Sequence, residues 1–96
     1  CFYSTFTDLK NNISNSANEF NMQSDYKFNE KTDKDFLNEG NNYIKINKNF
    51  VINGNNHTID ANNKAGLGVF DLNGIITIND LTFENVIETS IKSETV

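Results

Sequence analysis

The sequence predicts an all-β fold, namely a fragment of a right-handed parallel β-helix preceded by a short capping α-helix. Three observations predict this. Apolar residues first recur at helical spacing and then, from residue 20 onward, alternate with polar residues as in half-buried strands. Turns rich in Asn, Asp and Gly separate the alternating segments. Finally, the strand region repeats itself at a shift of 26 and then of 24, a period that is typical of a solenoid.

Size and charge limit the classes of protein that fit. The chain has 96 residues, a net charge of -5 and 36% hydrophobic residues, and its mean hydropathy is -0.55. A domain of this size buries only about two thirds of its unfolded surface, so we expect a thin core. The chain has no Arg and its lysines are dispersed, which argues against nucleic acid as a partner. No apolar run approaches the roughly 20 residues that span a bilayer.

The first part of the chain, residues 1–43, is expected to form an N-terminal cap. A helix over about 6–17 would carry one apolar stripe with a spacing of three, four and four: Phe6, Leu9, Ile13 and Ala17. Thr5 and Asp8 resemble a capping box in which Asp replaces the usual Glu or Gln.

Two further segments complete residues 1–43. Residues 20–28 alternate in polarity. They are expected to begin an irregular first rung, a rung being one full turn of the β-helix. Residues 29–43 are polar, and only Phe36 and Leu37 are available to pin them as a loop.

Residues 44–96 are expected to hold two rungs, about 44–61 and 69–86. A shift of 26 places apolar residues on apolar residues and Asn on Asn: Ile44 on Phe70, Ile46 on Leu72, Asn47 on Asn73, Phe50 on Ile76, Ile52 on Ile78 and Asn53 on Asn79. Past the turn "GNNH" the shift drops to 24, which places the second half of one rung on the next: Thr58 on Thr82, Ile59 on Phe83 and Asp60 on Glu84. The strands are expected to be "YIKI", "FVIN" and "HTID", then "VFDL", "IITIN" and "LTFEN".

Repetition at this period has a physical meaning. Each rung returns about 4.8 Å above its start, so equal positions stack in columns. The apolar matches would then fill the axis, and the matched Asn residues would form amide ladders at the corners. Leucine-rich repeats share the period, but their pattern needs Asn at 86 and an apolar residue at 88, where this chain has Val86 and Glu88. We also expect Lys45 and Asp71, in register at 26, to form a cross-strand charge pair.

The turn "GNNH" is the first place to look for a binding surface. It is longer by two than the matching turn of the next rung, so Asn55, Asn56 and His57 should protrude as a corner. His57 is the only histidine and has no Cys near it in the sequence, so the expected role is to shape the turn rather than to bind metal.

Asp60 and Glu84 form the only acidic pair that the repeat brings together. Equal positions on neighbouring rungs should set the two carboxylates roughly 5 Å apart, a spacing that suits Ca²⁺ or the carboxylate pair of a retaining glycosidase. Yet they occupy the outward phase of the strands, and the sequence places no third acid, Arg or Lys in register with them. We therefore expect two solvated acids, and no catalytic, cofactor-binding or metal-binding residue.

Residues 44–85 resemble the right-handed parallel β-helix repeats of archaeal adhesin-like surface proteins, especially those of methanogens. "YIKINKNFVINGNNHTIDANN" and "VFDLNGIITINDLTFEN" carry the resemblance, and "TFTDLKNNI" and "SDYKFNE" look like that family's leader. The resemblance implies an extracellular or cell-surface module, non-enzymatic, that serves as a stalk or as a binding face for glycans or a partner cell. The same fold occurs in polysaccharide lyases and hydrolases, so the alternative is the N-terminal part of a carbohydrate-active enzyme with its active site in later rungs.

We expect the chain to be part of a longer protein with further rungs, since it opens on Cys1 without a Met and stops at Val96 within a polar segment. Cys1 is the only cysteine, so it offers no internal disulfide and leaves the redox compartment open.

Overall fold

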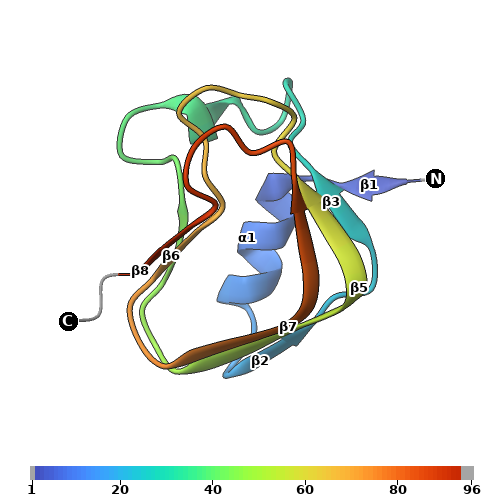
Figure 1. The fold of residues 1–96 in the computed structure, drawn as a ribbon, viewed down its shortest axis with the longest axis vertical. Coiled ribbons are helices and arrows are strands. Elements are labelled where there is room, and N and C mark those ends of the chain that lie inside the picture. Colours follow the sequence, from blue (N-terminus) through green and yellow to red (C-terminus); the bar gives the residue numbers. More distant parts are fainter. Residues whose placement is uncertain (1, 94–96) are drawn as a thin grey trace.

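The computed structural model describes residues 2–93, and Cys1 lies outside them. The described chain is mostly parallel β-sheet with one short α-helix, a content compatible with an all-β or an α/β class (Figure 1). The strands are β1 (Tyr3–Ser4), β2 (Glu19–Asn21), β3 (Asp25–Lys27), β4 (Ile44–Ile46), β5 (Phe50–Asp60), β6 (Phe70–Leu72), β7 (Ile76–Glu84) and β8 (Ile91–Ser93). The helices are α1 (Phe6–Ser14) and a 3-10 helix, η1 (Lys34–Leu37). No helix within residues 2–93 has the length and apolar character of a bilayer span.

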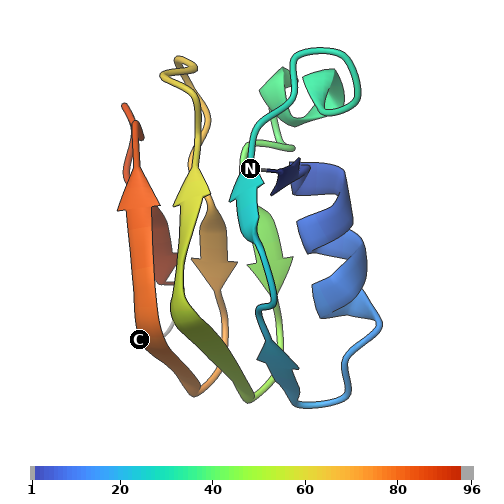
Figure 2. The same ribbon diagram turned by 90° about the vertical axis from the view of Figure 1, so that its right-hand side faces the viewer.

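The strands form two sheets that share one interior. In the five-stranded sheet, β5 is central: β2 pairs with its first half and β3 with its second half on one edge, and β7 pairs along the other edge. β1 extends this sheet by pairing with β3. The second sheet has the order β4-β6-β8. Every one of these pairs is parallel. The strands therefore stack in layers, as Figure 2 shows.

The register predicted from the repeat is confirmed. β4 pairs Ile44 with Phe70, at the predicted shift of 26. β5 pairs with β7 at the same shift as far as Asn53, and at a shift of 24 from His57 onward. The shift changes at an irregularity between Asn53 and His57, as the "GNNH" turn predicted.

This turn does not separate two strands, so the predicted division between "FVIN" and "HTID" was wrong. β5 runs unbroken over 11 residues, and β7 likewise joins two predicted strands. The extra residues form a β-bulge in which Asn55 and Asn56 adopt left-handed backbone, with φ of 51° and 66°. Gly54 lets β5 and β7 approach closely here, because a Cβ at this position would lie 2.4 Å from the Asp80 carbonyl oxygen. The bulge thus absorbs the length difference without interrupting the sheet.

The helix α1 closes one end of the layers (Figure 2). The predicted capping box is confirmed: the Thr5 hydroxyl accepts from the Asp8 amide at 3.1 Å, and the Asp8 carboxylate accepts from the Thr5 amide at 3.2 Å. The helix is shorter than the predicted 6–17, because Asn15 caps it after Ser14 and Ala17 lies exposed beyond it. The remaining residues of the apolar stripe, Phe6, Leu9 and Ile13, are buried against the sheets.

Columns of apolar side chains fill the interior. Ile52 lies between Phe20 of β2 and Ile78 of β7 and is 0% exposed. A second column runs through Tyr26, Ile59 and Phe83. The β7 members are only half-buried, because β7 has no strand on its outer edge among residues 2–93. The buried core is Phe6, Leu9, Ile13, Met22, Tyr26, Phe28, Phe36, Ile44, Ile46, Phe50, Ile52, Ile59, Ala61, Leu67, Val69 and Phe70.

Two segments differ from expectation. In the loop 29–43, Phe36 of η1 is buried as predicted, but Leu37 is 42% exposed and does not pin the loop. Asp33 takes that role, since its side chain is fully buried beneath α1.

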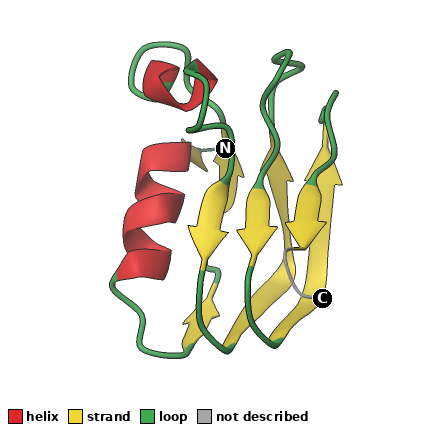
Figure 3. Cartoon of the chain, turned by 90° about the vertical axis from the view of Figure 1, so that its left-hand side faces the viewer, coloured by secondary structure: helices red, strands yellow, loops and turns green. Residues whose placement is uncertain are grey.

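Beyond residue 86, β8 was not predicted. It places Ile91 in register with Phe70 and begins a third layer of the second sheet (Figure 3).

Candidate functional site

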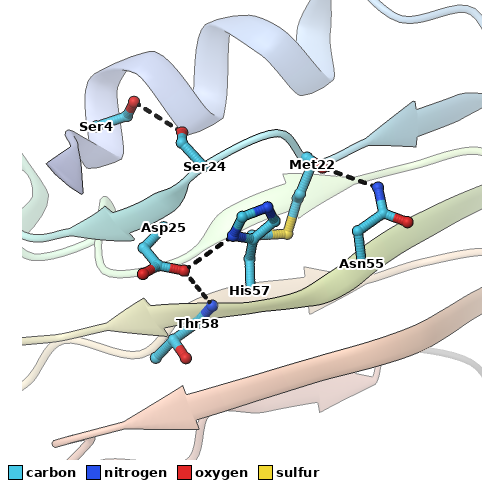
Figure 4. A network of polar contacts seen from close by, with 7 residues as sticks. All are labelled: Ser4, Met22, Ser24, Asp25, Asn55, His57 and Thr58. Carbon is cyan, nitrogen blue, oxygen red and sulfur yellow. Dashed lines mark hydrogen bonds and ion pairs between the residues drawn. The ribbon is translucent and has the colours of Figure 1, made fainter. Parts of the chain in front are cut away.

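The predicted binding corner lies at the bulge of β5, facing the link between β2 and β3 (Figure 4). Asn55 and Asn56 are exposed, whereas His57 turns back against β3 and is half-buried. The Asn55 side-chain amide donates to the Met22 carbonyl oxygen at 2.8 Å. The Asn56 side chain makes no hydrogen bond within the described chain and is exposed, so its whole amide is open to an external partner.

Asp25 organises this corner. One carboxylate oxygen, Oδ1, accepts from the Thr58 backbone amide at 2.9 Å and contacts His57 Nδ1 at 3.1 Å. The hydrogen bond from the Thr58 amide lowers the pKa of Asp25, partial burial opposes that shift, and His57 lowers it further. Because the ionised carboxylate only accepts, the proton of the contact sits on Nδ1. The contact therefore fixes the orientation of the imidazole ring, and Nε2 is the ring nitrogen that does not contact Asp25.

A carboxylate that orients an imidazole is one part of a general-base site. The other part is a hydroxyl within reach, and Ser24 stands nearby in Figure 4. The Ser24 hydroxyl, however, is bonded to the Ser4 hydroxyl at 3.0 Å, and no hydrogen bond joins it to His57. Within residues 2–93 no group of three or more His, Cys, Asp or Glu side chains is placed to hold a metal ion. The geometry of His57 is that of a tether between β3 and β5.

The expectation of two solvated acids was wrong for Asp60. Its register with Glu84 is as predicted, and Glu84 is exposed, but Asp60 is 5% exposed. Oδ1 of Asp60 accepts from the Asn62 amide at 2.7 Å and from the Asn85 side chain at 3.1 Å. The carboxylate is buried because it supports the turn that follows β5. Lys27 of β3 is also in register with Asp60, contrary to the expectation that no Lys would be.

The amide ladder at one predicted corner is confirmed and is longer than expected. The Asn79 amide donates to Asn53 Oδ1 at 3.0 Å, and the Asn53 amide donates in turn to Asn21 Oδ1 at 2.8 Å and to Glu19. The column therefore crosses three strands.

At the other predicted corner, Asn47 and Asn73 are exposed and share no side-chain hydrogen bond, so the ladder expected there is absent from residues 2–93. The backbone holds this corner instead, through the Asn73 amide and the Ile46 carbonyl oxygen at 2.8 Å. Asn49 contributes a bond that was not anticipated, since its Oδ1 accepts from the Ile75 amide at 3.0 Å.

The predicted pair of Lys45 and Asp71 is in register but not bonded. Asp71 is 6% exposed, and its Oδ1 has no hydrogen-bond partner within the described chain. Lys92 of β8 flanks Asp71 on the other side, and its ammonium lies 4.6 Å from the Tyr43 ring centroid. Lys45 and Lys92 are therefore in register with Asp71 on its two sides, but neither forms an ion pair with it within residues 2–93.

Two organising carboxylates, Asp25 and Asp33, were missed. Aligning "DYKF" with "TIDA" at a shift of 33 would have placed Asp25 beside Thr58 and so pointed to the first. Asp33 lies in a loop without a repeat partner, and no sequence signal identified it.

Comparisons of the chain with protein-family models, with curated proteins and with solved structures found no match.

Proposed function

We propose that this chain is the N-terminal part of a right-handed parallel β-helix and acts as a non-enzymatic, adhesin-like module, secreted or at the cell surface. The observation that carries the proposal is the parallel register between β5 and β7, with equal positions stacked at shifts of 26 and then 24. A chain that stacks in this way presents the same side chains at regular intervals along one axis. Such a surface suits contact with a repeating ligand.

The two ends of the stack support this assignment. The helix α1 covers one end with three buried side chains, as a terminal cap does in a solenoid. At the other end, Ile76 and Ile78 of β7 are only half-buried and Ile75 is 77% exposed. Repeat folds bury such faces by adding units, so further rungs would continue from β7 and β8.

The outward face supports contact with glycans. Thr77, Asn79 and Thr82 of β7 are exposed, and Asn56 projects from the bulge. Amide and hydroxyl groups at a regular spacing can exchange hydrogen bonds with sugar hydroxyls, which both donate and accept. The contacted partner would be a surface glycan of a neighbouring cell or of the surrounding matrix.

Binding of the full chain to an array of glycans, and to cells with and without their surface glycans removed, tests the functional proposal. We expect selective retention on glycans, reduced by Asn56→Ala and unaffected by Asn38→Ala, an exposed Asn beside η1. Equal binding to glycan-stripped cells together with a blank array would contradict it.

A second candidate function is the start of a carbohydrate-active β-helix enzyme. One observation favours it: Lys27, Asp60 and Glu84 occupy one column across three strands, which brings a cation and two acids to one face. Incubation with a panel of polysaccharides, followed by detection of new reducing ends, distinguishes the two. Turnover that is lost in Glu84→Gln would assign an active site to this column, earlier in the chain than the later rungs that the resemblance implies. Absence of product would contradict an active site in this column.

A further inference from the structure

A basic groove lies between α1 and β4, two elements that Figure 3 shows side by side. One hollow of about 380 Å³ lies among α1, η1 and the start of β4. A second, of about 250 Å³, continues along β4 and shares Ser14 and Lys45 with the first. Three lysines line the two hollows, Lys10, Lys45 and Lys48, against a single acid, Asp35. The groove thus carries an excess of positive charge in a chain whose net charge is -5.

None of these three ammonium groups forms an ion pair with a carboxylate in the described part of the chain. Lys10 Nζ lies 5.9 Å from the centroid of the Phe36 ring. Lys48 Nζ lies 5.3 Å from the Phe50 ring centroid and donates to the Ser16 carbonyl oxygen at 2.7 Å. Lys45 leaves its register partner Asp71 unbonded and lines both hollows instead. Rings and a carbonyl position the cations while leaving their charge available to a ligand.

The chemistry of the lining selects among anions. Bidentate recognition of phosphate favours Arg, and a nucleic-acid surface needs many clustered cations. The chain has no Arg, and only three lysines line the groove. Peptide grooves offer pockets to apolar anchors, whereas Phe36 and Ile44 in this lining are buried in the core. The remaining polar groups of the lining are the Ser14 hydroxyl and the side chains of Asn41 and Asn47, and such groups pair with sugar hydroxyls. The Asn41 nitrogen donates to the Asp35 carbonyl oxygen at 3.3 Å, so its Oδ1 is the atom that would accept from a sugar.

We propose that the groove between α1 and β4 binds a carboxylate-bearing glycan. Lys10, Lys45 and Lys48 would each attract a carboxylate along an extended chain, and Asn41 and Ser14 would bond the hydroxyls between them. This inference rests on the proposed function as a glycan-binding module. It adds a second contact surface, separate from β7 and Asn56, and names the class of glycan that this surface would bind.

Calorimetric titration of the full chain with a short oligouronate tests the proposal. The methyl ester of the same oligouronate serves as an uncharged control, and a poly-glutamate peptide as an acidic control without sugar. Each of Lys10→Gln, Lys45→Gln and Lys48→Gln should weaken oligouronate binding by roughly two- to five-fold, the effect of one solvent-screened charge contact. Asp35→Asn should tighten binding by a similar factor, since it removes the single acid of the groove.

Lys31→Gln is the matched control, because Lys31 is exposed and lies outside the groove. It should leave the affinity unchanged, and added salt should weaken binding by the wild type. Equal affinity for the methyl ester, equal affinity for poly-glutamate, or equal loss in Lys31→Gln and Lys45→Gln would each overturn the inference. Binding of neutral glycans without the oligouronate would overturn it while leaving the proposed function intact, and binding of no glycan at all would contradict both.

Discussion

Asp33 is a buried side chain whose removal should strongly destabilise the fold. Its carboxylate is 0% exposed. Oδ2 accepts from the backbone amides of Phe6 and Asn29 at 2.9 and 2.8 Å. Oδ1 accepts from the Thr7 amide at 3.0 Å, the Thr7 hydroxyl at 2.6 Å and the Thr32 hydroxyl at 3.3 Å. One carboxylate thus joins the first turn of α1 to the loop before η1.

The expected cost of Asp33→Ala follows from these bonds. The Phe6 amide is in a buried hydrogen bond, so leaving it without an acceptor should cost about 1–3 kcal/mol. The Thr7 and Asn29 amides are partly accessible, and water can replace the lost acceptor, so each should cost about 0.5–1.5 kcal/mol. The lost negative charge at the helix N-terminus adds about 0.3–1 kcal/mol. The total, roughly 2 to 7 kcal/mol, is a large share of the 5–15 kcal/mol typical of a domain.

Urea unfolding followed by circular dichroism measures this cost. Asp33→Ala should lower the transition midpoint without changing the slope, as expected when stability changes but the exposed surface does not. Asp35→Ala is the matched control close by in the same loop. Its side chain is exposed, so the free energy of unfolding should change by less than about 0.5 kcal/mol. Equal midpoints for the two variants would refute the assignment of Asp33 as the anchor of α1.

Three further predictions concern the stack and its bulge, each checked by unfolding experiments. Ile52→Ala should destabilise by about 2–5 kcal/mol because the side chain is 0% exposed, whereas Ile75→Ala, at a residue 77% exposed, should change stability by less than about 0.5 kcal/mol. Gly54→Ala should cost about 1–3 kcal/mol because the added methyl group overlaps β7, and an unchanged midpoint would exclude that close approach. The pKa of Asp25 is lowered from its ordinary value near 3.8, chiefly by the hydrogen bond from the Thr58 amide. Its ionised carboxylate therefore stabilises the fold at a pH above that value, and this stabilisation is lost as the pH falls below about 4. Asp25→Asn should therefore flatten the loss of stability on acidification, and an unaltered acid limb would contradict this.

The stacked register was predictable because a parallel stack repeats the same environment at equal positions. Ile52 and Ile78 enter the same column, so both must be apolar, and a shift of 26 finds them. Residues 20–28 were expected to begin an irregular first rung, and β2 and β3 do pair in parallel with β5. Their register was not predicted, because the shifts are 32 and 33. The polar loop 29–43 lengthens that spacing, and a search at one fixed period does not detect it. β8 was not predicted because its spacing is shorter than the repeat. Ile91 pairs with Phe70 at a shift of only 21.

The buried carboxylates were less predictable for a different physical reason. Asp60 follows the apolar Ile59 as an exposed acid of an alternating strand would, and Asp33 lies between polar residues of a loop. The burial of both depends on which backbone amides point at them. Those amides come partly from elsewhere in the chain, as with Phe6, which is 27 residues before Asp33. Hydrophobic patterning reports which face a residue occupies and carries no information about such donors. The unbonded state of Asp71 is equally invisible to register alone.

Disulfide trapping tests the parallel register of β5 and β7 most directly. In a Cys1→Ser background, Val51→Cys with Thr77→Cys, and Thr58→Cys with Thr82→Cys, join residues directly opposite each other. Parallel neighbours lie about 4.8 Å apart, within the roughly 4.4–6.8 Å between Cα atoms that a disulfide spans. We expect both pairs to oxidise readily, and the exchanged pairs, Val51 with Thr82 and Thr58 with Thr77, to stay reduced. Rapid oxidation of the exchanged pairs instead would show antiparallel pairing and would contradict the stacked fold on which the proposed function rests.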